Sequence, residues 1–139
     1  MSIDAYLNFN GNCREAVEFY TDVFGAEKPQ LMTFADMPPH PDYPLAEESK
    51  QLIMHTQLTI GGSRVMFSDV MPEMPFVVGN NISLAFVTDN KDDIQSAFEK
   101  LKVGGTVNME LQETFWSKYF GMVTDKFGVG WQLNLNVEE

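Results

Sequence analysis

Residues 82–105, ISLAFVTDNKDDIQSAFEKLKVGG, decide the fold of the chain. Large apolar and small residues alternate over the first six positions, which predicts a strand at 82–87. After Asp89 and Asn90 the apolar residues recur at the spacing of one helical face, and they are Ile94, Ala97, Phe98 and Leu101. Gly104 and Gly105 then favour the end of a helix. The stretch therefore predicts a strand followed by a helix.

The same order occurs near the start of the chain. Residues 6–9 form a short strand candidate, and a helix is expected after Asn12, with Asn12 as its cap and Glu15 completing a capping box. Apolar positions at helical spacing follow, and they are Ala16, Val17, Tyr20, Val23 and Phe24. Gly25 is the expected helix end.

Further strand candidates follow each predicted helix. After the first they cover 30–34, 51–60 and 63–69, with a hairpin signal at Gly61-Gly62; after the second they cover 106–111, 114–124 and 130–137. The order β-α-β-β-β therefore occurs twice. We predict an α+β fold in which two βαβββ modules, residues 1–70 and 78–137 of a single domain (1–139), form a curved mixed sheet, or half-barrel, with the helices outside.

Alternation along these strands predicts which side chains face the helix and which face inward. In the strand at 51–60, the set Leu52, Met54, Leu58 and Ile60 should face the helix, and the set Ile53, His55, Gln57 and Thr59 should face inward. In the second module, Ile82, Leu84 and Phe86 should face the helix, and Asn81, Ser83 and Ala85 should face inward. This mixed inner face is typical of a small-molecule pocket shared by the modules.

Composition narrows the possible partners. The formal net charge is -11, which disfavours binding to nucleic acid or to anionic membrane surfaces. The chain has one cysteine, Cys13, so it cannot form an internal disulfide. No apolar run approaches the ~20 residues needed to span a bilayer, and no signal peptide is visible. We therefore expect a cytoplasmic protein. Eleven Phe and nine Met residues supply apolar groups for a core and for the lining of a cavity.

The ordered stretches YLNFNGNCREAVEFYTDVFGAE, MTFADMPP, IMHTQLTIGGSRVMFSD, NNISLAFVTDN and GGTVNMELQETFWSKYFGMVTDKFGVGWQLN cover almost the whole chain. Together they resemble the vicinal oxygen chelate superfamily of glyoxalase I, bleomycin-resistance proteins and extradiol dioxygenases. The resemblance is closest to its PhnB-like branch, also described as 3-demethylubiquinone 3-methyltransferase-like. It implies paired βαβββ modules and a homodimer, and it leaves the activity open because fold does not define function.

The metal enzymes of this superfamily take one ligand from the first and last strand of each module's sheet. The resemblance transfers these positions to Asp4 (or Ala5), Met66 (or Phe67), Asn81 and Gln132. This set contains no histidine, and a thioether with two neutral amides is a poor ligand set for a transition metal. We therefore expect no metal or other cofactor, with a divalent metal as the alternative.

His55 is the candidate catalytic residue, because an imidazole can exchange protons near neutral pH. A structural hydrogen bond or a ligand contact would explain it equally well. The predicted pocket residues are Tyr6, Asn8, Phe34, His55, Gln57, Ser68, Asp69, Asn81, Ser83, Trp116, Tyr119 and Gln132. Trp131 has the opposite parity to Gln132 and is expected in the core.

Two function hypotheses follow from these residues. The first is a protein that binds a small organic molecule between its modules without a standard metal site. The alternative is a glyoxalase- or lyase-type enzyme with an altered site. The acidic, proline-rich segment 35–50 interrupts the repeat, and it is open whether this segment is a lid, a dimer or partner contact, or an ordinary surface loop.

Overall fold

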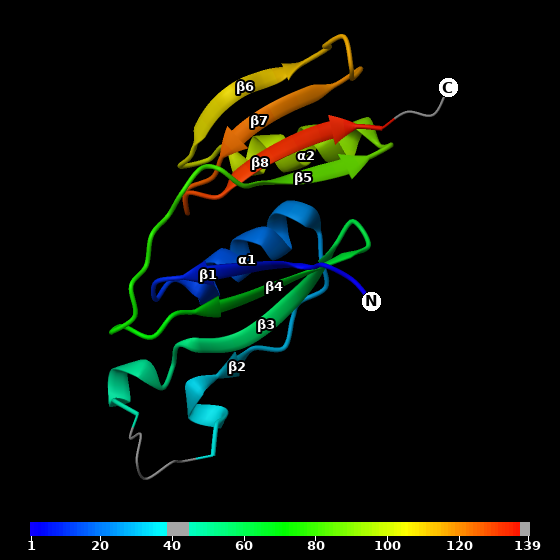
Figure 1. Cartoon of the computed structure of the whole chain (residues 1–139). Helices are drawn as coiled ribbons and strands as arrows, with labels where there is room; N and C mark the ends of the chain where they lie inside the picture. Colours follow the sequence, from blue (N-terminus) through cyan, green and yellow to red (C-terminus); the bar gives the residue numbers. More distant parts are fainter. Residues whose placement is uncertain (39–44, 137–139) are drawn as a thin grey trace. The chain divides into compact units, whose positions relative to one another are not determined.

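The computed structural model describes residues 1–38 and 45–136 (Figure 1). The chain divides into two compact units, Met1–Phe76 and Val77–Glu139, and each is described separately below. Within the described residues, each unit has a four-stranded mixed sheet and one α-helix. Neither helix in this part of the chain has the length and apolar character needed to cross a bilayer.

The first unit is a βαβββ module. Its sheet has the strand order β1-β4-β3-β2, with β1 parallel to β4 and the other neighbours antiparallel. Its elements are β1 (Ala5–Phe9), α1 (Cys13–Phe24), β2 (Met32–Thr33), β3 (Ile53–Ile60) and β4 (Ser63–Asp69). Gly61 and Gly62 both have positive φ, at 57° and 83°, as the predicted tight hairpin between β3 and β4 requires.

The second unit repeats this arrangement. Its sheet has the order β5-β8-β7-β6, so that in both units the first strand pairs in parallel with the fourth. Its elements are β5 (Ser83–Thr88), α2 (Lys91–Leu101), β6 (Thr106–Gln112), β7 (Phe120–Thr124) and β8 (Gly130–Leu135). The predicted α+β fold of two βαβββ modules with curved mixed sheets is confirmed (Figure 1).

The core of the first unit lies between α1 and one face of its sheet. The predicted apolar positions Ala16, Val17, Tyr20 and Val23 are buried, and α1 packs on β3 and β4. The ring of Phe67 on β4 stacks between Tyr20 and Phe9, with centroid separations of 5.8 Å and 6.3 Å. Gly25 ends the helix in the left-handed conformation, as predicted.

The core of the second unit is built in the same way. Its predicted helical positions Ile94, Ala97, Phe98 and Leu101 are all buried, and α2 packs on β5, β7 and β8. From the sheet, Val123, Trp131 and Leu133 complete this core. The side chain of Asn90 accepts hydrogen bonds from the backbone N–H groups of Asp92 and Asp93, which fixes the start of the helix.

Three local predictions are wrong. The strand expected at 114–124 begins only at Phe120, because Thr114 and Ser117 close a turn through their own hydrogen bonds. Ile82 precedes β5 and is 75% exposed, so it does not face the helix. Ile53 is fully buried although its parity predicted the inward face, which shows that the alternation is broken at the start of β3.

The segment 35–50 lies partly outside the described residues, because 39–44 are not described. Its described parts include short 3-10 turns at Phe34–Asp36 and Glu47–Ser49. Whether this segment acts as a lid, a contact or a surface loop stays a prediction. The residue Val137, predicted to end the last strand, also lies outside the described part of the chain.

Candidate functional site

Each sheet has one face covered by its helix and one face opposite to it, which we call the open face. In the first unit, β1, β3 and β4 contribute alternating side chains to the open face. They are Tyr6, Asn8, His55, Gln57, Met66 and Ser68. Tyr6 pairs with Met66 and Met66 with Gln57, so these three side chains form one row across the sheet. Five of the six belong to the predicted pocket set.

Tyr6 and His55 meet across the open face. The Tyr6 hydroxyl lies 3.3 Å from Nδ1 of His55, and the ring centroids are 5.9 Å apart. Tyr6 belongs to β1 and His55 to β3, and β4 runs between these strands. The contact therefore joins residues 49 positions apart in the sequence, and it places a phenol and an imidazole in one hydrogen-bonded pair.

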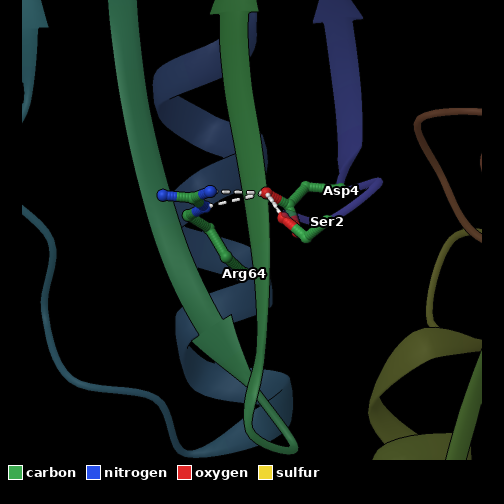
Figure 2. Close-up of polar contacts among 3 residues, drawn as sticks. All are labelled: Ser2, Asp4 and Arg64. Carbon is green, nitrogen blue, oxygen red and sulfur yellow. Dashed lines mark hydrogen bonds and ion pairs between the residues drawn. The ribbon is translucent and has the colours of Figure 1, made fainter.

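Asp4 is already engaged in an ion pair. Its Oδ2 accepts hydrogen bonds from Nη2 of Arg64 at 2.6 Å, from Nε of Arg64 at 3.0 Å and from the Ser2 hydroxyl at 3.2 Å (Figure 2). The hydrogen bond from Arg64 is the largest influence that lowers the pKa of Asp4 below its usual value. An arginine bound to this carboxylate competes with any metal ion for the same oxygen.

Asp69 accepts hydrogen bonds from the backbone, and its side chain lies on the face of β4 opposite to Ser68. Its Oδ1 accepts the N–H groups of Gly11 and Cys13 at 2.9 Å and 3.0 Å, and its Oδ2 accepts that of Ile53 at 2.9 Å. The residue is 4% exposed. Asp69 therefore caps the start of α1 from the neighbouring strand rather than facing the predicted pocket.

This arrangement overturns the predicted capping box at the start of α1. The side chain of Asn12 accepts no capping hydrogen bond, because its backbone is not in the extended conformation and Asp69 takes the neighbouring amides. Cys13 lies fully buried beside this carboxylate. Burial, with a smaller contribution from the charge of Asp69, raises the pKa of the Cys13 thiol to about 12, which leaves it a poor nucleophile.

Phe34, another predicted pocket residue, opens a 3-10 turn. It is half-buried, and its backbone N–H donates to the carbonyl of Leu52. Its place in a pocket stays a prediction.

In the second unit the open face is formed by β5, β7 and β8. Ala85 pairs with Gln132 and Gln132 with Met122, giving one row, and Ser83, Gly130 and Thr124 give the next. Nε2 of Gln132 donates to the Ser83 hydroxyl at 3.2 Å, so two predicted pocket residues are joined here. Asn81 lies in the exposed segment before β5.

A cavity of about 300 Å³ lies in the second unit, beside the start of β5 and the start of β8. The segment 79–82 before β5 contributes to its walls, together with residues of β5, β6, β7 and β8 and the turn before β8. Its lining residues are Gly79, Asn80, Ile82, Ser83, Asn108, Met122, Val123, Thr124, Gly128, Gly130 and Trp131. None of these described lining residues carries a charged side chain. Of the predicted pocket residues, Ser83 lines the cavity.

The two aromatic candidates of the second unit lie in different places. Trp116 is 56% exposed, and its ring packs edge-on against Phe120 at 5.5 Å. Tyr119 instead turns to α2, where its hydroxyl accepts a hydrogen bond from Gln95 at 3.1 Å and Nζ of Lys91 lies 4.8 Å from its ring. Tyr119 therefore contacts the helix and not the open face. Trp131 is buried in the core, as predicted, and its indole N–H donates to Asp125.

The four positions that were predicted to correspond to metal ligands carry weak donors. Asp4 is held by Arg64, Met66 offers a thioether, and Asn81 and Gln132 offer neutral amides. Over residues 1–38 and 45–136, no group of three or more His, Cys, Asp or Glu side chains could hold a metal ion.

The sequence reasoning missed most of the cavity lining. Met122, Thr124 and Gly130 share the parity of the open face, so alternation along β7 and β8 could have identified them. Asn108 could not be found in this way, because the pairing of β6 with β7, which has register shifts, sets its position. Its Oδ1 accepts a hydrogen bond from the Thr124 hydroxyl at 2.9 Å.

Two βαβββ modules, each with a helix on one sheet face and polar and apolar side chains on the other, define a class of paired-module proteins. Comparison with known proteins agrees with this class. The model of the Glyoxalase/Bleomycin resistance protein/Dioxygenase superfamily matches residues 2–133. The chain belongs to this superfamily, which confirms the resemblance predicted from its sequence.

Individual relatives of the chain agree with its assignment to this superfamily. Protein YjdN of Escherichia coli (strain K12) is 33% identical over an alignment of 146 positions, and the alignment covers 97% of this chain and 95% of that protein. The crystal structure of protein PA1353 from Pseudomonas aeruginosa is similar with a TM-score of 0.82 and 38% identity, covering 96% of both chains. A structure described as a putative 3-demethylubiquinone-9 3-methyltransferase, PhnB protein, from Bacillus cereus has a TM-score of 0.70 and 29% identity, covering 98% of this chain and 100% of that one.

Proposed function

We propose that the chain binds a small, uncharged organic molecule in the cavity of its second unit, without using a metal ion. The cavity of about 300 Å³ is the observation that carries this proposal. Ligand pockets in proteins have volumes of about 300–1,000 Å³ and combine apolar walls with a few polar groups. A single-ring compound is the size of ligand that such a volume favours.

The lining favours a neutral ligand with hydrogen-bonding groups. The Oδ1 atom of Asn108 accepts from Thr124, which leaves the Asn108 amide N–H groups to donate to a ligand. The Ser83 hydroxyl accepts from Gln132, which leaves its own proton to be donated. Met122 and Ile82 supply apolar contact area. A charged ligand would be desolvated here without an opposite charge, which is costly.

The chemistry of the side chains supports binding without a metal ion. Of the four positions predicted to correspond to metal ligands in the superfamily, three offer a thioether or neutral amides, and Arg64 binds the fourth, Asp4. An imidazole-free set of this kind binds Zn²⁺ or a similar ion weakly. The expected absence of a resident metal therefore remains part of the proposal.

Titration of ¹⁵N-labelled protein with benzamide, phenol and indole tests this function. We expect benzamide to shift the backbone amide signals of Ser83 and Thr124, which line the cavity. Benzoate has the same ring but carries a charge. We expect its affinity for the cavity to be at least about tenfold lower than that of benzamide, because its charge would be buried without an opposite charge.

Two variants, one that fills the cavity and one matched control, complete this experiment. Met122→Trp should fill the cavity and abolish the shifts, whereas Met37→Trp, at an exposed position of the first unit, should leave them unchanged. Equal benzamide affinity in Met122→Trp, or no shift at these amides with the whole panel, would overturn the proposal.

We also propose that the protein acts as a cytoplasmic homodimer. Its single cysteine is buried and not in a disulfide, which is compatible with the cytoplasm, and the exposed Phe115 offers apolar surface to a partner. Light scattering after gel filtration would measure the mass. A mass near the 15.7 kDa of one chain at micromolar concentration would contradict the dimer.

A further inference from the structure

We infer that Tyr6 positions His55 as a directed hydrogen-bond donor, and that this pair forms a second binding site, for a small carboxylate, on the open face of the first unit. Both side chains belong to the first unit, so this site is independent of the cavity proposed above. Its basis is the hydrogen bond between the Tyr6 hydroxyl and Nδ1 of His55, at 3.3 Å.

The geometry of the sheet makes this contact informative. Adjacent strands lie about 4.8 Å apart, so β1 and β3, with β4 between them, are separated by roughly 10 Å. Tyr6 and His55 must therefore both extend over β4 to meet. Ser68 on β4, which pairs with Asn8 in the row beyond Met66, is only 8% exposed, consistent with side chains that cover this strand. Tyr6 itself remains 43% exposed.

The hydrogen bond selects one form of the imidazole. A neutral phenol is a better donor than acceptor, and the unprotonated nitrogen of a neutral imidazole is a good acceptor. When the Tyr6 hydroxyl donates to Nδ1, the ring proton must reside on Nε2, because the bond made by one nitrogen sets the state of the other. His55 then has an N–H donor on the ring edge opposite to Tyr6.

The groups around the pair favour a carboxylate oxygen as the hydrogen-bond acceptor for Nε2–H of His55. Hydrogen bonds to carboxylates are stronger than bonds between neutral groups. Gln57 and Asn8 supply further amide donors on the same face. Asp4, just before β1, and Arg64, in β4, form an ion pair, so the charge of Arg64 offsets that of Asp4.

The state of the ring can be measured directly. In the full chain with His40→Gln, His55 is the remaining histidine, and its ring nitrogens can be observed by ¹⁵N NMR. We expect the signal pattern of the Nε2–H form. Tyr6→Phe should change this pattern toward a mixture of both forms, because the donor to Nδ1 is removed.

Tyr119→Phe is the matched control, because it removes a tyrosine hydroxyl that bonds to Gln95 in the other unit. It should leave the His55 pattern unchanged. A purely structural contact would lower stability in Tyr6→Phe without changing the ring state. An Nδ1–H pattern in the wild type, or the same pattern in Tyr6→Phe, would overturn the positioning role.

Benzoate is the probe for the binding site. We expect it to shift the His55 ring signals in the wild type and in Tyr119→Phe, and to bind roughly fivefold more weakly to Tyr6→Phe, the effect of losing about one hydrogen bond. An absent response at His55, or equal affinity in Tyr6→Phe, would refute the site. Because benzamide reports on Ser83 and benzoate on His55, failure of this inference is distinguishable from failure of the cavity proposal.

Discussion

Replacing Asp69 with asparagine should destabilise the first unit strongly, although the two side chains have the same shape. The carboxylate accepts three backbone N–H groups, from Gly11, Cys13 and Ile53, at 2.9–3.0 Å. An asparagine has one acceptor oxygen and one NH₂ group. If the oxygen remains at the position of Oδ1, the NH₂ group faces the N–H of Ile53, and two donors then oppose each other.

The magnitude follows from these three bonds. Leaving the buried N–H of Ile53 without an acceptor costs about 1–3 kcal/mol. The two bonds that remain lose the charged acceptor, and each weakens by about 1 kcal/mol. The expected loss in the free energy of unfolding is therefore roughly 3–5 kcal/mol, a large part of the stability of a small domain.

The assay must report on the first unit, whereas both tryptophans, Trp116 and Trp131, belong to the second. Amide hydrogen exchange at Ile53 and Phe67 and circular dichroism in urea are suitable. Asp36→Asn is the control, because its carboxylate accepts the N–H of Thr33 at an exposed position, and its cost should be about 1 kcal/mol or less. If both variants unfold with the same free energy, Asp69 does not hold the start of α1 as described.

Three further predictions concern other parts of the chain. Asp125→Asn should destabilise the second unit by a similar amount, about 2–4 kcal/mol, because this buried carboxylate accepts N–H groups from Phe127, Val129 and the Trp131 indole; tryptophan fluorescence in urea measures it. Cys13 should resist a thiol reagent in the folded protein and react after unfolding. In the folded protein the thiol pKa is raised from 9.0 to about 12, so the unfolded chain loses this proton at a lower pH than the folded protein does. The free energy of unfolding of the wild type should therefore fall relative to that of Cys13→Ala as the pH rises from 9.0 to about 12. Removing metal ions with EDTA should leave both the melting temperature and benzamide binding unchanged; a fall in either would favour the enzyme hypothesis with an altered metal site.

The repeated fold could be predicted because its signals are local. The spacing of Ile94, Ala97, Phe98 and Leu101 defines one helix face, and every one of them is buried as expected. Gly61 and Gly62 mark the hairpin through the positive φ that glycine tolerates. The prediction failed at 114–119, where the apolar and aromatic residues resemble a strand but a turn closed by Thr114 and Ser117 replaces it.

The candidate site could be predicted only in part. Parity along the strands places Tyr6, His55 and Gln57 on one face, and the structure has them there. The same reasoning cannot find Asn108, whose position depends on a strand pair with register shifts. Nor can it show that the Tyr119 side chain turns to α2, where Gln95 and Lys91 contact it.

By itself, the sequence determined the two modules, the helix faces and, except at the start of β3, the side of the strands that carries polar residues, because periodicity and turn residues act over a few positions. The tertiary structure decided which of those residues meet. Asp69 accepts hydrogen bonds from backbone amides at the start of α1, and Arg64 forms an ion pair with Asp4. Tyr6 forms a hydrogen bond with His55 across an intervening strand. Each pair is separated by 49 or more residues, and a contact of that range depends on strand order and register, which local sequence patterns do not specify.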